Sequence, residues 1–95
     1  MDADELEQWL GSAESRRVGW KGRDGKASES VGHAAGRRIV AILRSGVREN
    51  EDYALMRKAV GVIARHRAQR PTNFVTSRWR YSLMNWGYDP LKDDL

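Results

Sequence analysis

The chain has 95 residues, no cysteine and a net charge of +4. This length predicts a single domain over residues 1–95, and the lack of cysteine excludes disulfides and thiolate metal sites. No apolar run is long enough to span a membrane, and the acidic start is unlike a secretory signal. We therefore expect a soluble cytoplasmic protein with no membrane partner.

Basic residues are concentrated in the middle of the chain. Residues 1–15 hold five acidic residues and no Lys or Arg, whereas residues 16–80 hold sixteen Lys and Arg against five acidic residues. Residues 81–95 hold one Lys and three Asp. Most of the basic residues are Arg, whose planar guanidinium group suits phosphate. The distribution favours an anionic partner, and a solvated arginine-rich surface is the alternative interpretation.

A first helix is predicted over residues 3–10, with Asp2 as its cap. Its apolar stripe, spaced i, i+3 and i+4, consists of Leu6, Trp9 and Leu10. The following residues, 11–29, contain four glycines and no helical period. They predict a long basic loop, because structureless segments of this length are usually either functional or disordered.

Within this loop, the stretch "GWKGRDGKAS" superficially resembles a phosphate-binding P-loop. The glycine spacing does not fit, and no strand precedes the stretch, so nucleotide hydrolysis is excluded. We expect Val18 and Trp20 to pin part of the loop to the core. Its amides and cations can then lie along a phosphate backbone, and a plain solvent-exposed linker is the alternative.

Two middle helices are predicted over residues 30–45 and 50–69, with a short link that makes them pack antiparallel. The expected apolar face of the first consists of Val31, Ala35, Ile39, Ile42 and Leu43. The expected opposite face consists of His33, Arg37 and Arg44, with Arg38 at the margin. Glycines cost stability inside a helix, so Gly32 and Gly36 predict close approach of another backbone.

Asn50 is the expected cap of the second middle helix, and Pro71 forbids its continuation. Its predicted core stripe consists of Tyr53, Met56, Val60, Ile63 and Ala64. Off this stripe lie Leu55, Ala59 and Val62. We expect these three to be exposed, as a surface for dimerisation or for a protein partner.

A last helix is predicted over residues 77–86, capped by Thr76 or Ser77. Its buried stripe is expected to consist of Trp79, Leu83 and Trp86. Gly87 ends this helix, Pro90 prevents continuation, and residues 91–95 form a loose tail. Since no segment alternates with period two, the fold class is all-α, with one small domain of about four helices.

No residue pattern in the chain indicates catalysis. The two histidines, His33 and His66, lie on different predicted helices and lack metal-ligand spacing. No nucleophile motif is present. We therefore expect no metal, no cofactor, no small-molecule substrate and no enzymatic activity.

The basic residues of the loop and helices are the candidate nucleic-acid contacts, with double-stranded DNA favoured. They are Arg16, Arg17, Lys21, Arg23, Lys26, Arg37, Arg38, Arg44, Arg57, Lys58, Arg65, Arg78 and Arg80. No set of base-reading residues is identifiable, so weak or shape-based specificity is expected, as in a nucleoid-associated protein. Asn85 is expected to cap its helix rather than read a base edge.

Four segments resemble a family of short bacterial proteins, with fungal and archaeal members, that carries a domain-of-unknown-function label. They are "ELEQWLGSAESRRVGW", "SVGHAAGRRIVAILR", "YALMRKAVGVIARHRAQRP" and the C-terminal "RWRYSLMNWGYDPLK". Members are often labelled DNA-binding, and no catalytic residues come with the resemblance. The family pattern has Gln where Trp20 stands and His where Tyr88 stands, which makes Trp20 a candidate contact residue of this chain.

The sequence thus predicts a small non-enzymatic DNA-binding protein. A protein–protein adaptor or a dimerisation module within a larger complex is the alternative. The acidic first helix raises a further hypothesis, that it competes with DNA for the basic middle region.

Overall fold

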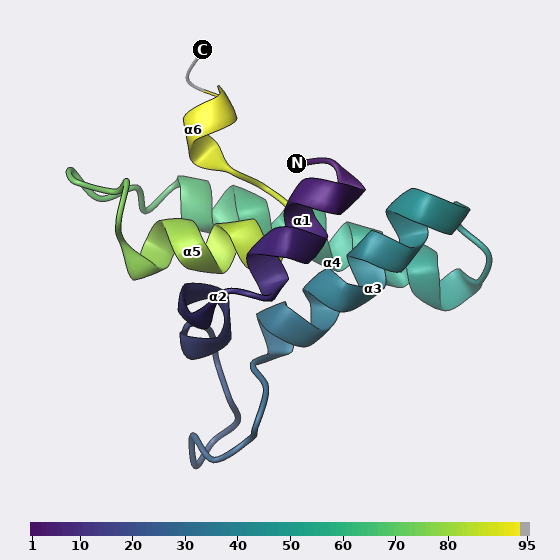
Figure 1. Cartoon of the computed structure of the whole chain (residues 1–95), viewed down its shortest axis with the longest axis horizontal. Helices are drawn as coiled ribbons and strands as arrows, with labels where there is room; N and C mark the ends of the chain where they lie inside the picture. The colour runs from purple at the N-terminus through teal and green to yellow at the C-terminus, as the bar shows by residue number, and fades with distance from the viewer. Residues whose placement is uncertain (94–95) are drawn as a thin grey trace.

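The structure, a computed structural model, describes residues 1–93, which form six α-helices and no strand (Figure 1). The helices are α1 (Ala3–Leu10), α2 (Ala13–Arg17), α3 (Val31–Ser45), α4 (Asn50–Arg67), α5 (Arg78–Asn85) and α6 (Pro90–Asp93). The all-α prediction is confirmed, and its four helices are α1, α3, α4 and α5. Of the helices in this range, none is long and apolar enough to cross a membrane.

Side-chain caps determine where the helices begin. Asp2 accepts from the backbone N–H of Glu5 at 2.8 Å, and Ser30 accepts from that of His33 at 3.0 Å. The prediction that Asn50 caps α4 is wrong, since Asn50 is already the first helical residue. The carboxylate of Asp52 instead accepts from the backbone N–H groups of Arg48, at 3.0 Å, and Glu49, at 3.2 Å.

Helix α3 is the central helix and is covered on two sides. On one side α1 buries Leu6 and Leu10 against Val40. On the other side a second cluster joins Ala35 to residues of α4 and to Trp86. A helix with two covered sides buries more than one apolar stripe.

The single stripe predicted for α3 is therefore wrong in part. His33, expected on the polar face, is buried, whereas Val31 and Leu43 are exposed. The predicted close approach of a backbone is confirmed at Gly36, whereas at Gly32 the close neighbour is a side chain. A Cβ on Gly36 would lie 2.4 Å from the backbone oxygen of Asn85, and one on Gly32 would lie 2.9 Å from Nε1 of Trp86.

The buried face of α4 is largely not the predicted one, although Ile63 of the predicted stripe is partly buried against the core. Leu55, Ala59 and Val62 pack in the core, so they are not available as a partner surface. Tyr53 and Val60 of the predicted stripe are 55% and 69% exposed, and Met56 is exposed as well. Both stripes have helical spacing, so periodicity cannot choose between them. The choice depends on which stripe fits Ala35 and Trp86.

The C-terminal stripe is confirmed for Leu83 and Trp86, which are buried. Trp79 is half-buried; its indole N–H donates to the backbone oxygen of His66 at 2.6 Å, and its ring packs edge-on against Phe74. Pro90 is the first residue of the short helix α6. Proline is tolerated in the first turn of a helix, and it also commonly follows the end of the preceding one.

The loose tail predicted for residues 91–95 is therefore wrong for 91–93, which are helical, and residues 94–95 lie outside the described range.

The predicted loop 11–29 contains the helix α2, which is too short to show a period. Its buried Ser15 is joined to Asn85, which is fully buried and does not cap α5. The Asn85 Oδ1 accepts from Trp9 Nε1 at 2.8 Å and from the Ser15 hydroxyl at 2.5 Å, and its Nδ2 donates to the Ser15 backbone oxygen at 3.0 Å. These bonds tie α1, α2 and α5 together.

Candidate nucleic-acid interface

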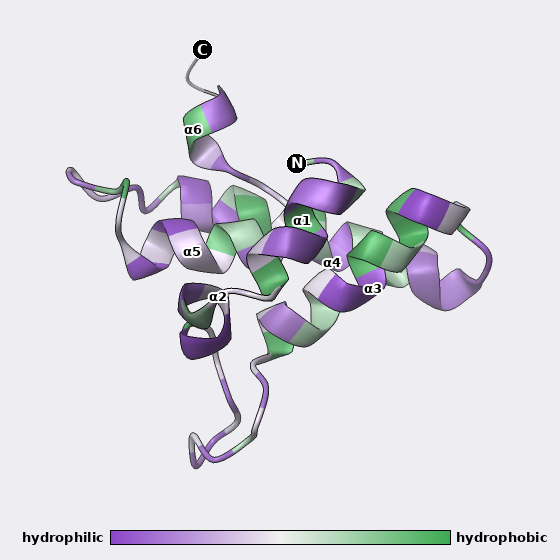
Figure 2. Ribbon diagram, viewed as in Figure 1, coloured by the Kyte–Doolittle hydropathy of each residue, from purple (hydrophilic) through white to green (hydrophobic). Residues whose placement is uncertain are grey.

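Residues 18–30, hereafter the finger, project from the helices between α2 and α3 (Figure 1). Val18 and Ser30 are buried and anchor its two ends. Its neck is closed by two backbone hydrogen bonds, Val31 N to Trp20 O at 2.9 Å and Ala27 N to Lys21 O at 3.2 Å. The finger is thus a closed loop with a defined shape, and it is largely hydrophilic (Figure 2).

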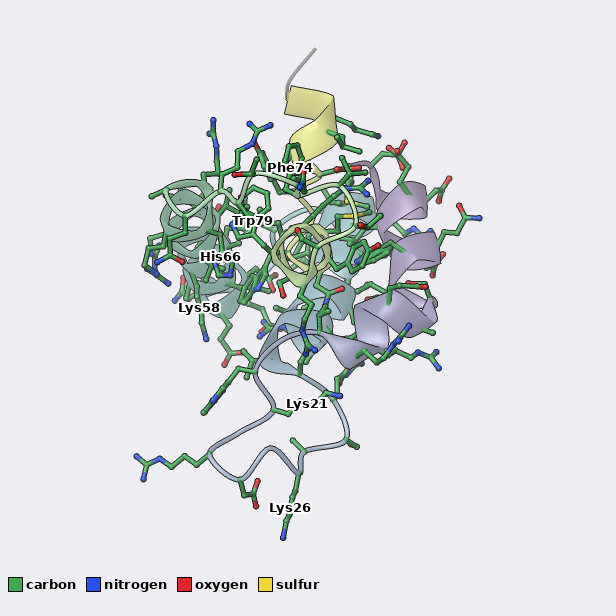
Figure 3. The ribbon with its side chains drawn as sticks, turned by 90° about the vertical axis from the view of Figure 1, so that its left-hand side faces the viewer. Lys21, Lys26, Lys58, His66, Phe74 and Trp79 are labelled. Atoms are coloured by element: carbon green, nitrogen blue, oxygen red, sulfur yellow. The ribbon has the colours of Figure 1, made fainter. Side chains whose placement is uncertain are left out.

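Three cations lie on the finger, namely Lys21, Arg23 and Lys26. Figure 3 shows Lys21 near the neck and Lys26 toward the tip. The single acid between them, Asp24, accepts from the backbone N–H of Lys26 at 3.0 Å. Within residues 1–93, none of the three cations forms an ion pair. Their charge is therefore available to an anionic ligand.

Further cations surround the base of the finger. Arg16 of α2 lines a hollow together with Ser28 and Glu29 of the finger. Arg17 and Arg78 line another hollow beside Val18. Arg17 lies 3.8 Å from Glu14, and both side chains are exposed, so this pair is weak.

Helix α4 contributes Lys58, which lines a pocket together with Gly19 and Trp20 of the finger. Arg65 is two turns further along the same side of α4, whereas Arg57 points about 100° away from Lys58 around the helix. Within the described part of the chain, these three cations have no ion-pair partner.

Four of the thirteen predicted contact residues are held by carboxylates instead. Arg37 binds Glu29 through two hydrogen bonds, at 2.8 and 2.6 Å, and Arg38 lies 3.5 Å from Asp52. Hydrogen bonds from Arg37, and secondly from His33, lower the pKa of Glu29 to about 2. Part of the predicted basic patch on α3 is thus already neutralised.

Arg44 and Arg80 are engaged more extensively. Arg44 binds Asp4 at 2.8 Å and Glu7 at 2.9 Å, both on the acidic helix α1, and its hydrogen bond lowers the pKa of Glu7. Arg80 binds Asp89 at 3.1 Å with only 16% of its side chain exposed. It also donates to the backbone oxygen of Val75 at 2.7 Å, so Arg80 ties α5 to the segment before it through Val75 and to the residue before α6 through Asp89.

Both histidines have structural contacts. The His33 ring lies between the Glu29 carboxylate, at Nδ1, and the backbone oxygen of Leu10, 2.8 Å from Nε2. The His66 Nδ1 lies 3.0 Å from the backbone oxygen of Val62. Across residues 1–93, no three His, Asp or Glu side chains lie close enough to hold a metal ion. The expectation that the protein is not an enzyme stays a prediction.

The chain belongs to the family described as a protein of unknown function (DUF3140), whose model matches residues 1–84. The match includes the opening segment and both middle blocks, and it ends within α5, before the second half of the C-terminal signature. No curated protein and no solved structure matches the chain.

Proposed function

We propose that this member of the DUF3140 family is a small non-enzymatic protein that binds DNA. The observation that carries the proposal is the sorting of its cations. The cations of the finger itself, of α2 and of the Lys58 side of α4 have no strong carboxylate partner, whereas Arg37, Arg38 and Arg44 of α3 and Arg80 of α5 are paired with carboxylates. The proposed contact residues are Arg16, Arg17, Lys21, Arg23, Lys26, Lys58, Arg65 and Arg78.

Arg37, Arg38, Arg44 and Arg80 contribute less in this proposal. A phosphate must displace or share an existing carboxylate partner to bind them, as at Arg44 with Asp4 and Glu7. Arg57 points away from the Lys58 side of α4, so it serves only a partner that wraps around this helix.

The proposed contacts are to the phosphate backbone, because Lys and Arg on a projecting loop and on helix surfaces recognise charge rather than sequence. Affinity should then fall steeply with salt, since each neutralised phosphate releases bound counterions. The finger alone, with Lys21, Arg23 and Lys26, accounts for about three phosphates and thus about 2.7 of the slope of log K against log salt.

A salt titration tests the proposal by fluorescence anisotropy on a labelled duplex. We compare the wild type with two variants that each lose three positive charges. The first is Lys21→Ala/Arg23→Ala/Lys26→Ala, and the matched control is Arg37→Ala/Arg38→Ala/Arg44→Ala. We expect the finger variant to lose most of its affinity at low salt and the control to lose less. A wild-type slope near zero, or equal losses in the two variants, contradicts the proposal.

A second candidate function is self-association through the exposed apolar face of α4, formed by Tyr53, Met56 and Val60. Helix α4 has acidic residues in its first turn and basic ones in its last, so two copies packed antiparallel bring ends of opposite charge together. Sedimentation velocity on the wild type and on Val60→Asp tests this. A wild type that remains monomeric at the highest attainable concentration excludes it.

A further inference from the structure

A pocket with a volume of about 360 Å³ lies where the finger meets helices α3, α4 and α5. Such a volume is in the range of pockets that take small organic ligands. It is lined by Gly19, Trp20, Val31, Gly32, Lys58, Val62, His66, Ser82, Asn85 and Trp86. Of these lining residues, only Lys58 is among the proposed phosphate contacts.

Trp20 supplies an aromatic wall that the fold itself does not need. Trp20 is 63% exposed, so the expectation that it pins the loop to the core is wrong, although tryptophan is the largest apolar side chain that a small core can bury. Its backbone is nevertheless fixed, since its carbonyl accepts from Val31 N at 2.9 Å. The preceding Gly19 has a φ of +98°, where a Cβ would meet Ser30 at 2.8 Å. The chain therefore holds Trp20 at the mouth of the pocket.

The inner part of the pocket presents unpaired polar groups. Nε1 of Trp86, which lies against Gly32, makes no hydrogen bond within residues 1–93, and neither does the hydroxyl of Ser82. No fully buried side-chain nitrogen or oxygen among these residues lacks a partner, so the indole N–H is accessible in part from the pocket. The pocket thus offers a donor and a hydroxyl beside apolar surface from Val31 and Val62.

The rim of the pocket is basic. Lys58 lines it without an ion-pair partner among the described residues, and Lys21 follows Trp20 on the finger. Figure 3 shows Lys58 and His66 on α4, with Lys58 nearer to the finger. Since the His66 Nδ1 lies beside the Val62 carbonyl, Nε2 is the ring nitrogen left for a ligand.

A nucleotide has a planar base with a polar edge and a phosphate beside it. These three groups match the aromatic wall, the polar groups and the basic rim of the pocket. We propose that the pocket takes one unpaired nucleobase of the bound strand, which stacks on Trp20 and bonds through its edge to the Trp86 N–H and the Ser82 hydroxyl. Lys58 and Lys21 then hold the flanking phosphates. This inference rests on the proposed function and deepens it: the protein should prefer single-stranded or bulged DNA to a perfect duplex.

The test measures binding to three labelled DNAs of equal length, namely a perfect duplex, a duplex with one unpaired thymine, and a single strand. Variant Trp20→Ala removes the stacking wall, and Lys26→Ala is the matched control at the finger tip. We expect the wild type to bind bulged and single-stranded DNA about tenfold more tightly than duplex, within the range for stacking of a base on an aromatic ring. Trp20→Ala should abolish this preference, whereas Lys26→Ala should weaken all three complexes alike.

Equal wild-type affinity for duplex and bulged DNA overturns the base pocket while leaving nucleic-acid binding intact. So does a Trp20→Ala variant that keeps the preference. If no DNA binds at all, the proposed function fails, and the pocket is then judged by titrating thymidine monophosphate into the protein and following the indole N–H signals by NMR. Shifts of the Trp20 and Trp86 signals support the pocket, and unchanged signals overturn it.

Discussion

Gly36 is the position where the packing of α3 against α5 can be tested most directly. A Cβ placed on Gly36 would lie 2.4 Å from the backbone oxygen of Asn85 and 2.8 Å from Cδ2 of Leu10. The leucine can change its rotamer, but the carbonyl cannot move alone. Asn85 is held by its side-chain bonds to Trp9 and Ser15, so Gly36→Ala must push the whole of α5 away from α3.

The expected cost follows from two opposing effects. Replacing glycine by alanine inside a helix gains about 1 kcal/mol of helix propensity. Overpacking of a tight contact costs about 1–3 kcal/mol, and more where the backbone must shift. Because a contact of 2.4 Å with a backbone oxygen is far inside van der Waals distance, we expect overpacking to win. The net loss should be about 2 kcal/mol, or about 10 °C in Tm for a chain of this size.

Gly61→Ala in α4 is the matched control, because its Cβ would meet only the end of the flexible Arg65 side chain, at 3.4 Å. That variant should gain about 0.5–1 kcal/mol from helix propensity alone. Urea unfolding followed by far-UV circular dichroism measures both variants. A Gly36→Ala variant as stable as the wild type would refute the close packing of α3 on α5.

Three further perturbations test the buried polar contacts and the ion pairs. Asn85→Ala leaves the Trp9 N–H and the polar groups of Ser15 without partners, and should cost about 3 kcal/mol in urea unfolding; an unchanged midpoint would show that water replaces the amide. Glu29, with its pKa lowered from 4.5 to about 2, stabilises the fold fully above pH 4.5, and this contribution is lost as the pH falls toward 2. The Tm of Glu29→Gln should therefore depend less on pH in that window than the Tm of the wild type does. Parallel plots of Tm against pH for the two proteins would contradict this. Asp4→Asn/Glu7→Gln frees Arg44 while keeping the buried Leu6, and should steepen the salt dependence of DNA binding by about 0.9. Unchanged binding would mean that α1 does not compete with DNA.

Competition by the acidic first helix is better tested by these point substitutions than by deleting the helix. Leu6 is fully buried and packs with Leu10 against Val40, so removing residues 1–8 would remove part of the core. The hypothesis of competition by this helix stays open, and it now concerns Asp4, Glu7 and the single arginine that they bind.

Local sequence patterns were sufficient for the helices and for several of their ends. Asp2, Ser30 and Ser77 cap their helices through hydrogen bonds that depend only on neighbouring residues, and Gly46 and Gly87 end helices with positive φ. Local signals also identified the close approach at Gly32 and Gly36. They missed α2, which is too short for a period, although Ser12, Glu14 and Arg17 mark its two ends.

The tertiary structure decided which helix faces are buried and which basic residues are neutralised by carboxylates. Helix α4 carries two apolar stripes of similar spacing, and contact with Ala35 and Trp86 selects Leu55, Ala59 and Val62. Arg44 is neutralised by residues about forty positions earlier in the chain, which no local pattern could pair with it. The sequence alone thus determined a basic helical protein, and long-range packing decided which of its basic residues remain open to a partner. The physical reason is that burial and ion pairing depend on neighbours in space, whereas helix formation and capping depend on neighbours in sequence.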